Sequence, residues 1–248
     1  MIHLKTPEQI EKMKKAGEIL ADCHKEIRKL IKPGITTEEI DIFVENFMLQ
    51  RGATPEQKGY HGYPFATCAS VNDVICHGFP SKTPLKDGDI VTIDMVVNLD
   101  GWLADSAWSY SVGNVSEDAK NLLKTTEEVL YIGIEQAVIG NRVGDISHAI
   151  QTYAEAKGYG VVRDFVGHAI GREMHELPQI PHYGPPHVGT QLKEGMVITI
   201  EPMLNIGMYH AKVDLDGWTA RTVDGSLSAQ YEHTLAITKN GPIILTKQ

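Results

Sequence analysis

The sequence has few cysteines and no long apolar run, and both shortages limit what the chain can be. Its three cysteines, Cys23, Cys68 and Cys76, are an odd number and show no Cys-x-x-Cys spacing. This argues against a disulfide framework and against a thiolate zinc site, and it suits a reducing compartment. No apolar stretch approaches the roughly 20 residues that a membrane helix needs, and the N-terminus lacks the apolar centre of a signal peptide. We expect a cytoplasmic protein without a membrane partner.

Clusters of basic residues are also missing. The chain has 23 lysines and arginines against 32 acidic residues, which gives a formal net charge of −9. This balance disfavours nucleic acid and anionic membranes as partners, so we expect no recognition of nucleic-acid sequence. A length of 248 residues is compatible with one large domain or two small ones.

A β-hairpin is strongly indicated near the middle of the chain, in the stretch KDGDIVTIDMVVNLDGWLADSAWSYSVG. We predict strands over 90–99 and 102–112, joined at Asp100-Gly101. A two-residue turn pairs Val96 with Asp105, so Asp94 and Asp105 share one face, roughly 7–8 Å apart. Two carboxylates in an apolar sheet repel each other and are costly to desolvate. A cation bound between them would offset both the repulsion and the cost of desolvation. The alternative interpretation is that this face of the hairpin is exposed to solvent.

Capping boxes, apolar periodicity and glycine stops predict four helices, over about 7–32, 37–51, 117–138 and 145–157. Further strands are predicted over 67–70, 74–76, 161–166, 196–200, 229–238 and 243–246. The stretches 168–189 and 205–228 are rich in turn-forming residues and are predicted to be loops.

The order of elements repeats: two helices, a loop region, then a strand with one embedded acid. DGDIVTID in the first half matches EGMVITIE in the second, which puts Asp94 and Glu201 in corresponding positions. We therefore predict an α/β fold in one catalytic domain spanning 1–248, with pseudo-twofold related halves of about 1–113 and 114–248.

Five side chains in or beside apolar strands are candidate metal ligands: Asp94, Asp105, His168, Glu201 and Glu232. Four carboxylates and one imidazole, without sulfur, suit divalent Mn, Fe, Co or Zn. Four carboxylates exceed what one ion needs, whereas two ions about 3.5–4 Å apart use them all. Such a pair makes water reactive and polarises a carbonyl, which is the chemistry of amide or ester hydrolysis. Taken singly, each residue is equally compatible with a strand end or a loop hydrogen bond.

Several stretches in the right order give the chain a family resemblance. They are YHGYP at 60–64, the segment 72–80 ending in ICHGFP, DGDIVTID, LAD at 103–105, GHAIGREMHE at 167–176, EGMVITIEPM and DGSLSAQYEHT at 224–234. With them the chain resembles the type I methionine aminopeptidases of the pita-bread fold. The resemblance implies an α/β (α+β) architecture with a curved, mainly antiparallel sheet covered by helices. It also implies removal of the initiator methionine from nascent chains, through hydroxide attack at a site with two divalent ions (Co, Mn, Fe or Zn).

The resemblance further implies a role for each site residue. Asp94, Asp105, His168, Glu201 and Glu232 are the implied metal ligands, with Asp105 and Glu232 bridging the two ions. Glu201 would also shuttle a proton, His175 would stabilise the tetrahedral intermediate, and His77 would hydrogen-bond the substrate backbone. The implied methionine pocket consists of Tyr60, Tyr63, Cys68 and Trp218. An implied secondary site for a monovalent cation consists of Asn72, Val74 and Ser228.

Three departures from the family pattern stand near these residues: Ala169 after the ligand histidine, the pair Glu173-Met174, and Val96. We expect them to tune metal preference or rate. Two rival functions are a proline-directed peptidase of the same fold, which normally carries an extra N-terminal domain, and a metal-free binding relative, which would have lost ligands. The expected partners are nascent N-termini and, transiently, the ribosome, and the expected state is a monomer.

Overall fold

The computed structural model describes residues 2–248, so the first residue of the predicted domain 1–248 lies outside the described part. Four α-helices are present: α1 (Pro7–Leu30), α2 (Thr37–Leu49), α3 (Glu117–Glu135) and α4 (Val143–Ala156). The strands of the first half are β1 (Thr54–Pro55), β2 (Cys68–Val71), β3 (Val74–Cys76), β4 (Ile90–Leu99) and β5 (Trp102–Ser111). Those of the second half are β6 (Gly160–Val161), β7 (Gly167–Ala169), β8 (Glu176–Ile180), β9 (Val197–Ile200), β10 (Met203–Asn205), β11 (Ala211–Val213), β12 (Ala220–Thr222), β13 (Ser228–Gln230), β14 (His233–Thr238) and β15 (Gly241–Ile244).

The first two helices begin where the sequence predicts, because each has a reciprocal cap. The side chain of Thr6 accepts a hydrogen bond from the backbone of Gln9 at 3.3 Å, and the Gln9 side chain accepts one from Thr6 at 2.9 Å. Thr36 and Glu39 make the same pair of contacts at the start of α2. Such boxes satisfy backbone donors that have no partner within the helix.

The predicted central hairpin is confirmed residue by residue. Strands β4 and β5 pair from Ile90 with Ser111 to Leu99 with Trp102, and Val96 lies opposite Asp105. Asp100 and Gly101 have φ angles of 53° and 75°, the left-handed conformation that a tight two-residue hairpin turn requires. β4 also pairs with β1 and β2, and a separate five-stranded sheet has the order β15-β14-β9-β7-β8.

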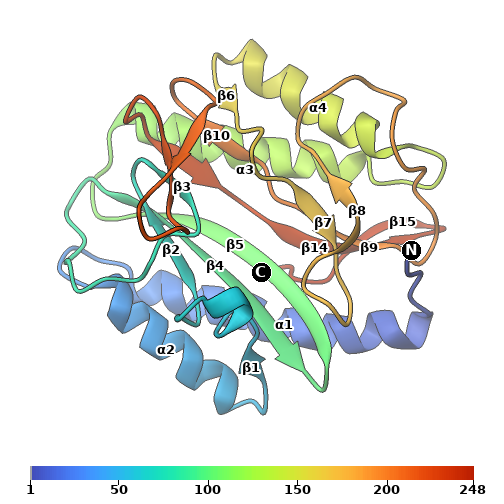
Figure 1. The fold of residues 1–248 in the computed structure, drawn as a ribbon, viewed down its shortest axis with the longest axis horizontal. Helices are drawn as coiled ribbons and strands as arrows, with labels where there is room; N and C mark the ends of the chain where they lie inside the picture. Colours follow the sequence, from blue (N-terminus) through green and yellow to red (C-terminus); the bar gives the residue numbers. More distant parts are fainter. Residues whose placement is uncertain (1) are drawn as a thin grey trace.

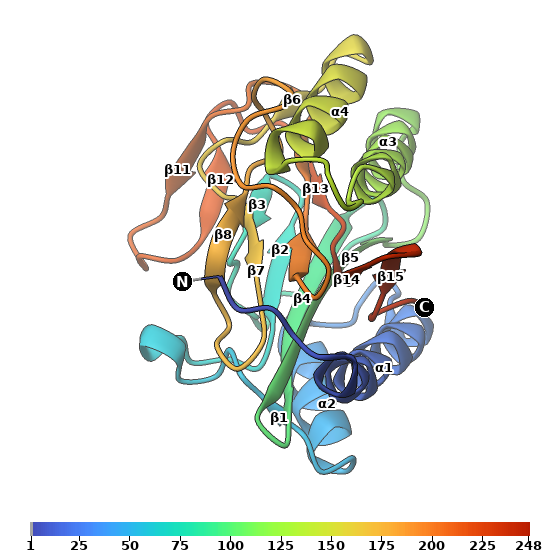
Figure 2. The same cartoon turned by 90° about the vertical axis from the view of Figure 1, so that its right-hand side faces the viewer.

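The helices and strands form separate layers. Figures 1 and 2 show the helices α1 to α4 on one side of the strands and none of them on the opposite side. Buried apolar side chains from both predicted halves, such as Leu20, Ile93, Leu130 and Ile198, belong to one continuous cluster. One continuous core therefore supports the strands of both predicted halves.

Two predicted strands are wrong in extent. The predicted strand over 229–238 is interrupted between β13 and β14 because the backbone N–H of Glu232 donates to the carbonyl of Ala107 on β5, at 2.8 Å. The predicted strand over 161–166 is reduced to β6, whose pairing with β10 ends at the hydrogen bond from the N–H of Val162 to the carbonyl of Met203, at 3.1 Å. The stretches predicted to be loops contain the short strands β8, β11 and β12. Strands of three to five residues are too short to show a periodicity.

Candidate metal centre

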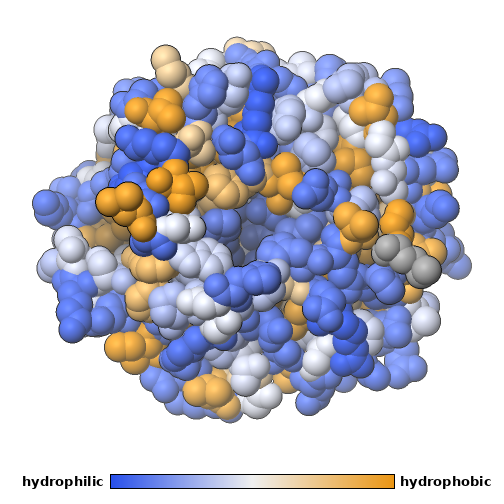
Figure 3. All heavy atoms as spheres, in the orientation of Figure 1, coloured by the Kyte–Doolittle hydropathy of each residue, from blue (hydrophilic) through white to orange (hydrophobic). Residues whose placement is uncertain are grey.

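A cavity of about 290 Å³ opens on the strand side of the molecule. Figure 3 shows a hollow near the centre of this face. All five predicted ligands line the cavity, and each comes from a different part of the fold. They are Asp94 on β4, Asp105 on β5, His168 on β7, Glu201 directly after β9, and Glu232 between β13 and β14.

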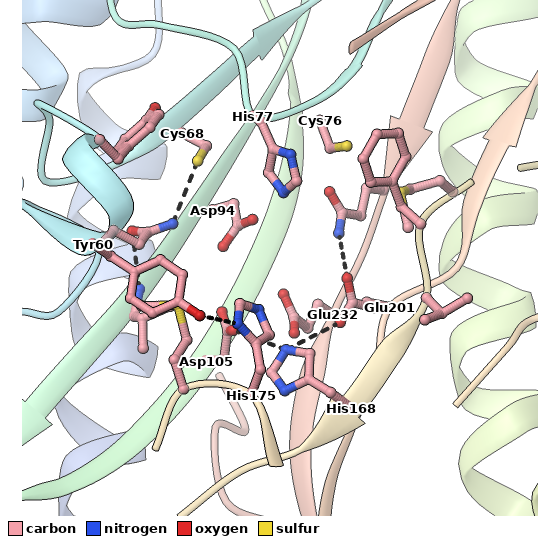
Figure 4. A pocket seen from close by; sticks show the side chains of 18 of the residues that line it. Tyr60, Cys68, Cys76, His77, Asp94, Asp105, His168, His175, Glu201 and Glu232 are labelled. Atoms are coloured by element: carbon pink, nitrogen blue, oxygen red, sulfur yellow. Dashed lines mark hydrogen bonds and ion pairs between the residues drawn. The ribbon is translucent and has the colours of Figure 1, made fainter. Parts of the chain in front are cut away.

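The candidate ligand atoms lie close together, as Figure 4 shows. One atom from each of Asp105, His168 and Glu232 lies within 4.8 Å of the other two. The Nε2 atom of His168 is 3.6 Å from Oδ2 of Asp105 and 3.6 Å from Oε1 of Glu201. These separations are those of groups that share a cation, longer than direct hydrogen bonds.

Hydrogen bonds between β5 and the chain around Glu232 bring the two halves together at the cavity floor. The N–H of Asp105 donates to the hydroxyl of Thr234 at 2.9 Å, and that hydroxyl donates to the Asp105 carbonyl at 2.8 Å. One residue along, the Ser106 hydroxyl donates to the carbonyl of Glu232 at 3.2 Å. The interruption between β13 and β14 therefore places Glu232 beside Asp105.

A second layer of hydrogen bonds orients the ligands. Thr199 accepts a hydrogen bond from the backbone of His168 at 3.0 Å and donates one to Oε1 of Glu201 at 2.8 Å. Nδ1 of His168 is 3.1 Å from the carbonyl of Ala169, so we assign its proton to Nδ1. This leaves the lone pair of Nε2 directed towards the carboxylates, the arrangement of a metal-binding imidazole.

The electrostatics of the cavity favour a bound cation. Burial and neighbouring like charges raise the pKa of Asp94 and Glu232 well above their ordinary values, and burial raises the pKa of Glu201 to about 7. Burial lowers the pKa of His168, but the nearby carboxylates of Asp105 and Glu201 outweigh it, so the net shift is upward. A cation would stabilise all four carboxylates in their charged form.

Unpaired oxygen atoms provide a test of fit. Among residues 2–248, Asp94, Asp105 and Glu232 each have one buried carboxylate oxygen without a hydrogen-bond partner. Buried polar atoms normally have a partner, and carboxylate oxygens are suitable ligands for divalent metals. The residues present therefore fit a divalent metal. Two cysteines also line the cavity, but burial raises the pKa of the Cys68 and Cys76 thiols well above 9, so both stay protonated.

His77 and His175 face the same cavity without belonging to the predicted ligand set. The ring of His175 lies 4.4 Å from that of His168, and its Nδ1 is 2.8 Å from the hydroxyl of Tyr60. Burial lowers the pKa of His175 to about 4 and lowers that of His77 as well. His77 has a φ angle of 57°, which is uncommon for a residue with a side chain. Both imidazoles are neutral at pH 7, so each offers one donor and one acceptor.

The four residues of the predicted methionine pocket also line this cavity. Tyr63 and Trp218 meet edge to face at 5.0 Å, and Tyr60 stands beside His175. Cys68 accepts a hydrogen bond from the Gln57 amide at 3.5 Å. Aromatic rings and a neutral thiol give this wall the character of a site for an apolar side chain.

The predicted monovalent cation residues lie outside this cavity. Asn72 and Val74 line a separate groove, and the carbonyl of Asn72 accepts the N–H of Ser228 at 2.9 Å. The hydroxyl of Ser228 is buried without a hydrogen-bond partner among residues 2–248. The three residues are adjacent, but a cation there stays a prediction.

Sequence reasoning missed several residues of the cavity wall. They are Gln57, Cys76, Asp164, Phe165, Val166, Met203 and Gln230. Gln230 donates to Oε2 of Glu201 at 3.4 Å, and its position two residues before Glu232 was a signal that could have identified it. Of the departures from the family pattern, Val96 and Met174 line the cavity, whereas Ala169 is buried behind it.

Comparison with known proteins agrees with this geometry. Residues 11–239 match metallopeptidase family M24. The chain is 51% identical to methionine aminopeptidase 1 of Bacillus subtilis, over the full length of both proteins. The crystal structure of methionine aminopeptidase from Rickettsia prowazekii superposes with a TM-score of 0.98 at 45% identity, covering 99% of this chain and 100% of that one.

A more distant likeness is to prolidase from Pyrococcus furiosus, with a TM-score of 0.80 at 27% identity, covering 99% of this chain and 65% of the prolidase. Among residues 2–248, no helix is long and apolar enough to cross a membrane. The predicted pita-bread architecture is confirmed, with four helices covering antiparallel strands. The chain belongs to metallopeptidase family M24.

Proposed function

We propose that this protein removes the N-terminal methionine from nascent polypeptides by hydrolysing their first peptide bond. One observation carries the proposal: four carboxylates and an imidazole converge at the base of a cavity whose wall is lined by aromatic rings and a thiol. High identity to several proteins named methionine aminopeptidase supports the same activity. The lower identity to prolidases makes a proline-directed peptidase the less favoured function.

The metal site in this proposal holds two divalent cations, drawn from Co, Mn, Fe and Zn. Asp94, Asp105, His168, Glu201 and Glu232 would hold the ions, and Asp105 and Glu232 would serve both. When bound, the pair would lower the pKa of a coordinated water and polarise the scissile carbonyl. Charge balance supports two ions, because four carboxylates exceed what one divalent cation neutralises.

Glu201 is the proposed proton carrier. Its carboxylate takes a proton from the attacking water and delivers it to the departing amine. The hydroxyl of Thr199 and the amide of Gln230 hold its two oxygens, at 2.8 and 3.4 Å. These contacts fix the direction in which the carboxylate faces the cavity.

His175 is the proposed donor to the oxygen of the tetrahedral intermediate. Burial raises the pKa of Tyr60, so its hydroxyl keeps its proton, and we assign this hydroxyl as the hydrogen-bond donor to Nδ1 of His175. A neutral imidazole that accepts at Nδ1 carries its own proton on Nε2. A donor of this kind, held in place before the reaction, stabilises charge that develops in the transition state. His77 hydrogen-bonds the substrate backbone beside it.

Selectivity for methionine comes from the aromatic wall of Tyr60, Tyr63 and Trp218, together with Cys68. A thioether makes favourable contacts with aromatic rings, each of about 0.3–1.5 kcal/mol. A side chain that is branched or charged lacks those contacts and meets a desolvated wall.

The remaining properties that we propose concern the whole protein. The chain acts as one catalytic domain with pseudo-symmetric halves, as a cytoplasmic monomer that contacts the ribosome transiently, and it does not read nucleic-acid sequence. A monovalent cation at Asn72, Val74 and Ser228 is part of the proposal. The acidic formal charge of −9 supports the absence of nucleic-acid recognition.

The test combines metal analysis with cleavage of the peptide Met-Ala-Ser. We expect the purified protein to hold two divalent ions and to release methionine, and to leave an Xaa-Pro dipeptide intact. The variant Asp105→Ala should stay folded, lose metal and lose activity, whereas Asp100→Asn, in the exposed turn of the same hairpin, should keep both. Preferential cleavage of the Xaa-Pro dipeptide, or an active metal-free Asp105→Ala protein, would refute the proposal.

A further inference from the structure

A lysine and a glutamate form a buried ion pair next to the catalytic cavity. Lys5 lies in the segment before α1, and Glu176 is the first residue of β8, directly after His175. Nζ of Lys5 contacts Oε2 of Glu176, and the two side chains are only 4% and 8% exposed. Nζ also donates to the carbonyl of His3 at 3.1 Å. Lysine and glutamate are almost never buried to this extent unless they are paired.

Stability alone does not account for this pair. Removing two charges from water is costly, and replacing a buried ion pair by apolar side chains of similar size is often neutral or stabilising. A charged pair at this place therefore calls for another explanation. The pair contacts the loop that ends at His175.

The Glu176 carboxylate closes that loop from inside. Its Oε1 accepts the backbone N–H of Arg172 at 3.1 Å. A Cβ on Gly171 would lie 2.5 Å from both Oε1 of Glu176 and Cε of Lys5, so the loop backbone is packed directly against the pair. On the far side, the guanidinium of Arg172 donates to the carbonyl of Gly101 at 2.9 Å and lies over the Trp102 ring. The loop is thus held from two directions.

Lys5 is itself fixed by its backbone. Its N–H donates to the carbonyl of Gly195 at 2.7 Å, in the turn that precedes β9. Figure 2 shows the N-terminal segment passing beside β7 and β8 before α1 begins. The backbone of Lys5 is therefore held beside the start of β9, the strand that Glu201 follows.

We infer that Lys5 is a positioning residue for His175 and acts through Glu176. This inference rests on the proposed function, because it takes His175 to act on the substrate. The ion pair fixes Glu176, Glu176 fixes the loop, and the loop sets the His175 ring 4.4 Å from the His168 ring. A misplacement of about 1 Å at a reacting centre is enough to lower a rate by roughly a hundredfold.

A double-mutant cycle tests this route of action. In the otherwise unchanged enzyme, Lys5→Met should lower kcat on Met-Ala-Ser by about tenfold or more, with KM and metal content nearly unchanged, and Lys5→Arg should restore most of kcat. In a His175→Ala background the same Lys5→Met change should alter kcat by less than about twofold, because the group through which Lys5 acts is gone. Equal fold-losses in the two backgrounds would overturn the inference.

Two further proteins separate positioning from a general loss of stability. Lys12→Met removes an exposed ion pair with Glu8 on α1, whose side chains are 51% and 80% exposed, and should leave kcat unchanged. If Lys5→Met folds poorly, the double variant Lys5→Met, Glu176→Met leaves no unpaired charge in the interior and should show the same loss of kcat. A folded double variant with the original kcat would contradict the inference.

Amide hydrogen exchange provides a readout that does not depend on activity. Exchange over residues 171–175 should accelerate in Lys5→Met and stay unchanged in Lys12→Met. If the original protein cleaves no Met-Ala-Ser but exchange accelerates as stated, the proposed function fails and the anchoring of the loop stands. Unchanged exchange over these residues in Lys5→Met would show that Lys5 does not hold the loop in place.

Discussion

Single residues with perturbed surroundings carry most of the chemistry proposed for this protein. The neutral state of His175 follows from burial, which lowers its pKa to about 4, and we assign its tautomer with Nδ1 as acceptor from the Tyr60 hydroxyl. Neither feature can be derived from the order of residues, because Tyr60 and His175 lie far apart in the chain. The resemblance of GHAIGREMHE to a family motif identified the residue, whereas the structure supplied the physical basis for its proposed role.

Replacement of His175 tests that role. We expect His175→Ala to keep its metal content and lose about 10²–10³-fold in kcat, the loss typical of removing one donor to a developing oxyanion. His187→Ala serves as the matched control, since His187 is 84% exposed and lies outside the cavity. Metal analysis and steady-state kinetics measure both effects. A His175→Ala enzyme with unchanged kcat would remove this residue from the mechanism.

A buried histidine behind the sheet links stability to pH. Nε2 of His24 lies 3.3 Å from the carbonyl of Ser106 and Nδ1 lies 2.7 Å from the Tyr110 hydroxyl, and burial lowers the pKa of His24 to about 3. In the unfolded chain the pKa returns to about 6.5. Between these values the unfolded state binds one more proton, so stability is full above pH 6.5 and falls as the pH falls.

We therefore expect the titration of His24 to lower the free energy of unfolding by about 1.4 kcal/mol for each pH unit below roughly pH 6. The variant His24→Gln retains one donor and one acceptor but does not titrate. Urea unfolding of both metal-free proteins at pH 7, 5.5 and 4.5 isolates His24, because they share every other titrating group. Parallel stability curves would contradict this assignment.

At the scale of elements, the sequence predicted those whose causes are local. Capping boxes located α1 and α2, and Asp100-Gly101 located the central hairpin with its register. The separation of β13 from β14 could not be predicted, because it results from a hydrogen bond between Glu232 and Ala107, more than a hundred residues away. The same long-range contact places Glu232 beside Asp105 at the candidate metal centre.

The turn between β11 and β12 is an element whose geometry bears on specificity. Oδ1 of Asp216 accepts the N–H groups of Trp218 and Thr219 at 2.8 and 2.9 Å, and Oδ2 accepts the Thr219 hydroxyl at 2.6 Å. This carboxylate holds the turn that presents the Trp218 ring to Tyr63.

Loss of these bonds should weaken the methionine pocket without altering the metal centre. We expect Asp216→Ala to raise KM for Met-Ala-Ser by about three- to tenfold, with kcat changing less, since losing hydrogen bonds of this kind weakens a site by about 1 kcal/mol. Asp216→Asn keeps one carbonyl oxygen, so its KM should lie between that of Asp216→Ala and that of the original enzyme. If Asp216→Ala binds the peptide as well as the original enzyme, the turn does not depend on this carboxylate.

At the scale of the whole molecule, side chains from both predicted halves of the chain meet at the candidate metal centre. The internal repeat predicted that Asp94 and Glu201 occupy corresponding positions, and both line the cavity. The separations between ligand atoms could not be predicted, because they depend on the bonds of Thr234 and Ser106 that join β5 to the second half. Binding of a monovalent cation could not be predicted from the residues either, and nor could the effect of Val96 on metal preference or rate. Both depend on contacts with ions and substrate, which are not part of the chain.

A centre built from both halves should couple metal binding to global stability. Mn²⁺ at about a hundred times its dissociation constant should raise the unfolding free energy by about 2.7 kcal/mol for each site that only the folded chain forms. Thermal unfolding with Mn²⁺ and with a chelator measures this effect. Glu232→Gln lacks one of the ligand charges, so Mn²⁺ should raise its unfolding free energy much less. An unfolding midpoint that is independent of Mn²⁺ in the original protein would exclude such coupling.

The central claim is that four acids and an imidazole, distant in sequence, hold two divalent cations in one cavity. Anomalous diffraction from a crystal grown with Mn²⁺ tests it most directly. The account predicts two adjacent anomalous peaks among these five side chains, both within ligand distance of Asp105 and Glu232. Peaks elsewhere on the molecule, or none between these five side chains, would contradict the account.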